Sequence, residues 1–180
     1  MSNQLIEILT LENSHQYEKA YDSYVQLYSS DRSNYDAWKH FYFFLWIAYD
    51  EDITIPSREN LELPSFLPSM LKEGQQVFAE MADFNFIAGY TISIFPYLFG
   101  DYKEMEKIGN EMILKATKLD PENHIYRMAY LGSIENVDRT LYEQSVREAA
   151  PFVALTFTGS GILNEYFKDV LYRIDKLRKH

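Results

Sequence analysis

The chain has 180 residues, of which 47% are hydrophobic and 24% are charged, the balance of a globular protein long enough to bury a substantial core. It has no cysteine, which excludes disulfides, thiolate metal sites and thiol nucleophiles. Its net charge of −10 disfavours nucleic acids and anionic lipids and favours cationic partners. The segment from Lys168 onward is locally basic, so the acidic excess lies in the residues before it.

The beginning of the chain does not look like a targeting segment. The first residues, MSNQLIEILTLEN, have no basic leader, and Glu7 interrupts their short apolar stretch. The longest apolar run, Phe41 to Tyr49, is far shorter than the roughly 20 residues that a membrane-spanning helix needs. We therefore expect a soluble cytoplasmic protein without membrane contacts.

Helical spacing of apolar residues predicts the first two helices. The first runs from Ser14 to Tyr28, and the second starts near Asn34. Apolar residues surround the second helix almost completely, which predicts that it is buried between neighbours. A connection over 51–68 follows, and its three prolines argue against a continuous helix there.

The same spacing predicts six more helices beyond this Pro-rich connection. Asp101 and Glu104 resemble a capping box at the start of one of them. No segment alternates with period two, so we expect no sheet and an all-α fold of about eight helices in a compact single domain, 1–180. The expected helices cover about 69–84, 85–99, 101–119, 124–134, 138–150 and, at the C-terminus, 160–179.

Two stretches, 14–50 and 84–136, resemble the tetratricopeptide repeat (TPR). In this family a tyrosine opens a helix, an alanine three residues later allows close approach, and a tryptophan follows in the next helix. The matching residues of the first stretch are Tyr17, Ala20, Tyr24, Asp31 and Trp38.

The second stretch carries the family's helix boundaries at Gly100-Asp101-Tyr102 and Leu119-Asp120-Pro121. It departs from the family in two ways: the interval between these two boundaries is about one helical turn too long, and Met105 takes the alanine position. The resemblance implies a TPR-like array of antiparallel helical hairpins, in which successive pairs stack to bury their apolar faces. A generic helical bundle is the alternative.

No pattern of residues indicates catalysis or metal binding. The four histidines, His15, His40, His124 and His180, are scattered, and no two lie one turn apart on a helix. Gly159-Ser160-Gly161 lacks the lysine and the preceding strand of a phosphate loop and favours a break between helices. We expect no enzymatic activity, no metal and no cofactor, with an unusual helical enzyme as an alternative.

The acidic charge and the 16% aromatic content favour protein binding, because tyrosine is enriched at interfaces. In general character the chain is similar to bacterial immunity proteins, which implies one basic protein partner, such as a nuclease toxin, and no nucleic acid. The alternatives are a general TPR-like adaptor, and a charge that serves only solubility. The oligomeric state stays open. The expected partner-binding residues are those of the irregular connection, Asp50, Glu51, Asp52, Glu59 and Glu62.

Overall fold

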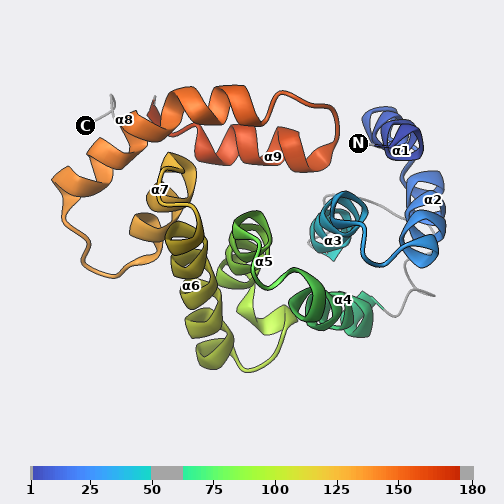
Figure 1. Ribbon diagram of the computed structural model, residues 1–180, viewed down its shortest axis with the longest axis horizontal. Coiled ribbons are helices and arrows are strands. Elements are labelled where there is room, and N and C mark those ends of the chain that lie inside the picture. The colour runs from blue at the N-terminus through green and yellow to red at the C-terminus, as the bar shows by residue number, and fades with distance from the viewer. Residues whose placement is uncertain (1, 50–62, 175–180) are drawn as a thin grey trace. The chain divides into compact units, whose positions relative to one another are not determined.

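The computed structural model describes residues 2–49 and 63–174, and every regular element in these two ranges is a helix (Figure 1). The predicted all-α class is confirmed. No helix in the described ranges is long and apolar enough to cross a membrane. The elements are α1 (Asn3–Asn13), α2 (Tyr17–Ser30), α3 (Tyr35–Tyr49), α4 (Leu63–Phe78), α5 (Ala82–Ile94), the 3-10 helix η2 (Pro96–Leu98), α6 (Tyr102–Leu119), α7 (His124–Ser133), α8 (Arg139–Thr156) and α9 (Ile162–Leu171).

The helices fall into two compact units. Among the described residues, the first unit contains α1 to α4 together with Ser160–Leu163, and the second contains α5 to α8 together with residues 164–174. Within each unit, helices that follow one another in the sequence pack against each other: α1 to α4 in the first unit and α5 to α8 in the second.

Aromatic side chains of α2 and α3 fill the core of the first unit. Trp38 is fully buried, stacks on Tyr42 with ring centres 4.6 Å apart, and donates its indole N–H to the Met70 carbonyl of α4 at 2.9 Å. Tyr24 stacks on Phe41 with ring centres 5.2 Å apart. The predicted burial of this second helix is confirmed, because most side chains of α3 are inaccessible to solvent.

A buried carboxylate joins three segments of the first unit. Glu12 of α1 is 3% exposed, and its Oε1 accepts the Tyr24 hydroxyl proton at 2.7 Å. Its Oε2 accepts the backbone N–H of Ile162, the first residue of α9, at 2.9 Å. Gly161 has φ of 97° there, and an added Cβ would lie 2.8 Å from Glu12 Oε2. Glu12 therefore occupies the position that an anion favours at a helix N-terminus.

The second unit is built on a close crossing of α5 and α6. A Cβ added to Gly89 would lie 2.8 Å from the Gly109 carbonyl oxygen, so the two backbones nearly touch. Beside this crossing, Phe167 of α9 is fully buried and packs against Phe86 and Phe157, with ring centres 5.4 and 5.2 Å away. Two glycines thus bring the helices together, and aromatic rings fill the space around them.

Several boundaries differ from the predicted ones. Helix α4 begins at Leu63 rather than near 69, although Pro68 removes one of its hydrogen bonds. Helix α8 continues through Pro151 to Thr156 instead of ending at 150. In both helices, apolar side chains beyond the proline become buried and offset its cost. Helix α9 ends at Leu171, short of the expected 179, while residues 175–179 lie outside the described ranges.

Two other differences concern helices α1 and α5. Helix α1 was not predicted, although Leu5, Ile8 and Leu9 are buried at helical spacing and Ser2 caps it by accepting the Leu5 N–H. Helix α5 ends at Ile94, and Pro96 opens a 3-10 turn instead of kinking the last turn of a longer helix. The predicted cap at Asp101 is confirmed, since its side chain accepts the Glu104 N–H at 3.1 Å.

Candidate functional site

The acidic residues that the sequence singles out for partner binding lie outside the described ranges. Their assignment therefore stays a prediction. They are Asp50, Glu51, Asp52, Glu59 and Glu62.

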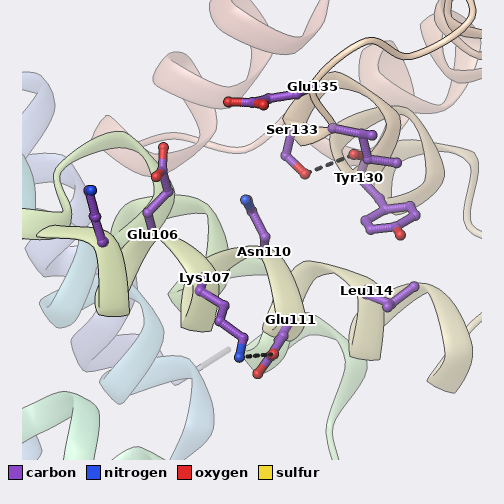
Figure 2. A pocket seen from close by; sticks show the side chains of 10 residues that line it. Glu106, Lys107, Asn110, Glu111, Leu114, Tyr130, Ser133 and Glu135 are labelled. Carbon is purple, nitrogen blue, oxygen red and sulfur yellow. Dashed lines mark hydrogen bonds and ion pairs between the residues drawn. The ribbon is translucent and has the colours of Figure 1, made fainter.

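A groove of about 410 Å³ in the second unit is the leading candidate site (Figure 2). One face of α6 forms one wall, and the end of α7 with the residues just after it forms the other. The α6 residues recur every three or four positions, so they share one side of the helix. The lining residues are Lys103, Glu106, Lys107, Asn110, Glu111 and Leu114 from α6, and Tyr130, Ser133, Ile134 and Glu135 from the opposite wall.

Two carboxylates on opposite walls of this groove have no partner within the described part of the chain. Glu106 and Glu135 are exposed, and neither forms a hydrogen bond or an ion pair there. By contrast, Glu111 lies 3.8 Å from the Lys107 ammonium group. Figure 2 shows the Glu106 side chain extending away from α6 toward the side on which Glu135 lies, and Glu135, just after α7, extending over the groove. The two free carboxylates are thus available to a cation from outside the chain.

The groove continues into a smaller pocket of about 170 Å³, because Glu106, Asn110 and Ser133 line both. Tyr90 and Ser93 of α5 form part of the wall of this pocket. The Ser93 hydroxyl donates to Asn110 Oδ1 at 3.2 Å, which ties α5 to α6 beside the opening.

Arg173, two residues after α9, completes the smaller pocket. Its Nε donates to the Val170 carbonyl at 2.9 Å, and its Nη1 donates to the Tyr142 hydroxyl at 2.7 Å. Burial raises the pKa of the Tyr90 hydroxyl, and hydrogen bonds with Tyr166 and Arg173 oppose this rise. A positive charge therefore lies at one end of a groove whose walls carry carboxylates.

Two of the histidines, His15 and His124, pack against neighbouring aromatic rings. His15 adopts a positive φ of 56° between α1 and α2 and packs edge-on against Tyr17. His124 begins α7, and its ring lies against Phe152 at 4.7 Å while Nδ1 lies 3.7 Å from Glu148. Within the described ranges, no three His, Asp or Glu side chains gather closely enough to hold a metal ion.

Sequence reasoning missed this groove, although one signal for it was present. The polar stripe along α6 has helical spacing, but only the packing of α7 shows which side of α6 borders a groove. Arg173 gave no signal, because it was expected on the face of a longer helix. In comparisons with known proteins, no family model matches the chain, and neither a curated protein nor a solved structure is significantly similar to it.

Proposed function

We propose that this chain is a non-enzymatic protein-binding protein, an immunity-type inhibitor that neutralises one basic protein such as a nuclease toxin. The observation that carries this proposal is the pair of unpartnered carboxylates, Glu106 and Glu135, on opposite walls of a groove of about 410 Å³. The net charge of −10 supports it further, because a long-range negative field attracts a basic partner.

A lysine or arginine of the partner fits between the two walls. There its positively charged group displaces water from both carboxylates and donates hydrogen bonds to them. A charge-assisted hydrogen bond of this kind contributes about 1.5–3 kcal/mol. Nearby tyrosines add contact area, since Tyr130 lines the groove and Tyr102, at the start of α6, is 54% exposed. Basic substrate grooves of nucleases present the charges that such a surface complements.

We also propose that the helices form a TPR-like array. Support comes from the packing of consecutive helices and from the burial of Ala20, Tyr24 and Trp38, three of the residues that carry the resemblance. A concave surface built by such repeats suits a peptide or a complex subunit, so a general adaptor is the second candidate function. The number of partners distinguishes the two, because an inhibitor has one tight partner and an adaptor has several.

The partner is to be captured from a native lysate with the tagged chain, identified by mass spectrometry, and compared with the product of the adjacent open reading frame. With the purified partner, a Glu106→Lys/Glu135→Lys variant is expected to weaken binding at least tenfold, or about 1.4 kcal/mol or more. The loss should be largest at low salt, because part of it is electrostatic.

The matched control is Glu7→Lys/Glu165→Lys, which changes the net charge equally at exposed positions outside the groove. If charge alone mattered, both double variants would weaken binding to the same extent, and the groove assignment would be wrong. Reversing the predicted acidic connection, beginning with Asp50, Glu51 and Asp52, tests the other candidate surface in the same assay. A loss confined to that variant would move the binding site there.

A further inference from the structure

Arg173 differs from the other arginines that the structure describes. Each of the other four forms an ion pair with a glutamate: Arg32 with Glu73, Arg127 with Glu148, and Arg139 and Arg147 with Glu143. Arg173 is partly buried, and within the described ranges it pairs with no carboxylate. Its hydrogen-bond partners, the Val170 carbonyl and the hydroxyls of Tyr142 and Tyr90, are all neutral.

Such a guanidinium has unused binding capacity. Arginine carries five N–H donors in a planar fork that matches a carboxylate, and a partly buried charge without a counter-ion is costly. Val170 and Tyr142 fix the orientation of the side chain. Gly132 makes room for it, since a Cβ added there would lie 3.4 Å from Nη1. The guanidinium is thus held in place against one wall of the 170 Å³ pocket.

We propose that this pocket binds a carboxylate group of a ligand lying in the groove, with Arg173 as its ion-pair partner. The hydroxyl of Tyr90 and the amide N–H groups of Asn110 line the same pocket and can donate hydrogen bonds to the second carboxylate oxygen or to adjacent acceptors. The volume equals that of roughly five or six water molecules, enough for a carboxylate with its first carbons.

A singly charged carboxylate fits better than a doubly charged phosphate. Glu106 lines both the pocket and the groove, and its negative charge at the junction repels a dianion more strongly. The same glutamate attracts a cation next to the bound carboxylate. The ligand class is therefore a peptide segment that presents a carboxylate with a basic group close by. This inference goes beyond the proposed function, because it holds whichever protein supplies the segment.

The test is NMR titration of the full-length, ¹⁵N-labelled chain with sodium acetate, with sodium chloride keeping the ionic strength constant. Saturable shifts are expected for the Arg173 Nε–H and for backbone amides near Tyr90, Asn110 and Ser133, with a Kd on the order of 1–10 mM. Shifts that stay absent or non-saturating through about 100 mM acetate would overturn the proposal.

Two peptides then distinguish the source of the carboxylate. Acetyl-Gly-Lys-Gly with a free C-terminus is expected to bind more tightly than acetate, because its lysine can reach Glu106, and the C-terminal amide of the same peptide should not bind. Equal binding of both peptides would exclude the carboxylate as the recognised group. Inorganic phosphate should bind more weakly than acetate, and the reverse order would overturn the assigned ligand class.

Arg173→Gln is expected to weaken acetate binding at least tenfold. Arg127→Gln is the matched control and should bind acetate like the unaltered chain, because Arg127 pairs with Glu148 away from the pocket. Far-UV circular dichroism checks that both variants fold. If Arg173→Gln does not fold, Arg173→Lys keeps the charge without the planar fork and should weaken binding several-fold. Unchanged acetate binding in the folded variant refutes the site, whereas the basic-partner test above stands or falls separately.

Discussion

The close crossing of α5 and α6 at two glycines predicts that an alanine there lowers the stability of the protein, which is the opposite of what helix propensity alone predicts. In a helix interior, alanine is favoured over glycine by about 1 kcal/mol, so helix propensity alone would make Gly89→Ala stabilising. In this chain the new Cβ would lie 2.8 Å from the Gly109 carbonyl oxygen and 2.9 Å from both the Ile113 nitrogen and its Cγ1. Two of these three atoms belong to the backbone and cannot rotate away.

The helices must therefore separate by roughly half an ångström, which loosens the contacts along their whole crossing. Overpacking of this kind costs about 1–3 kcal/mol, and the propensity gain offsets about 1 kcal/mol of it. Gly89→Ala is expected to lower the free energy of unfolding by about 1–2 kcal/mol. Gly109→Ala should behave alike, because its Cβ would lie 2.9 Å from both the Gly89 oxygen and the Ser93 nitrogen.

Urea unfolding followed by far-UV circular dichroism measures the effect. With an m value of about 1–3 kcal/mol/M, the midpoint should fall by about 0.3–2 M at an unchanged slope. Both tryptophans, Trp38 and Trp46, belong to the first unit, so their fluorescence shows whether that unit unfolds in the same transition. Ala154→Gly on the exposed side of α8 calibrates the propensity term at about 1 kcal/mol. A more stable Gly89→Ala variant would refute the close crossing.

Three further predictions concern the cores. Phe167→Ala should cost about 3–5 kcal/mol in urea unfolding because the ring is fully buried, whereas Phe152→Ala, at a ring that is 44% exposed, should cost clearly less. Glu12→Ala should lower the free energy of unfolding by about 2–5 kcal/mol, because it leaves the Tyr24 hydroxyl and the Ile162 N–H without their acceptor. Glu12→Gln keeps an acceptor and should therefore lower this free energy by less. Equal losses in the two variants would contradict the role of Glu12 as a hydrogen-bond acceptor. Burial, followed by the charge of Glu12, raises the pKa of Tyr24 well above 10, so the folded state keeps this proton while the unfolded state loses it. The Tyr24 proton should therefore leave the free energy of unfolding unaffected below pH 10 and lower it above pH 10 by up to about 1.4 kcal/mol per pH unit. Urea titrations at pH 9, 10 and 11 measure this loss, which should be absent from the Tyr24→Phe variant.

The helical class could be predicted because apolar spacing is a local signal. The spacing located α2, α3, α6 and α7 to within a few residues of their observed bounds. It failed where tertiary burial overrides a local breaker. Pro151 argued for the end of a helix, but Val153 and Phe157 beyond it are buried, and this burial maintains the helical path of α8 through the proline.

The candidate site was far less predictable, because it depends on contacts between distant segments. The groove needs α7 beside α6, and its pocket adds Arg173, which follows the last helix. No spacing rule predicts from the sequence that Asn110 and Arg173 line the same pocket. Charge composition predicted an acidic binding surface, and the sequence placed it on the acidic connection because that segment is irregular. The groove lies on regular helices, so nothing irregular in the sequence marked it.

The hydrogen bond between Glu12 and the start of α9 has a consequence for the order in which the protein is made. The two residues are 150 positions apart, so the ribosome must synthesise the chain past Ile162 before this residue can reach Glu12. Until then the N-terminal helices carry a carboxylate that lacks one of its native donors, and closing so long a loop carries an entropic cost of about 4 kcal/mol or more. We therefore expect the first unit to finish folding only after Ile162 has emerged from the ribosome, and nascent chains shortened before residue 160 to be sensitive to protease in α1.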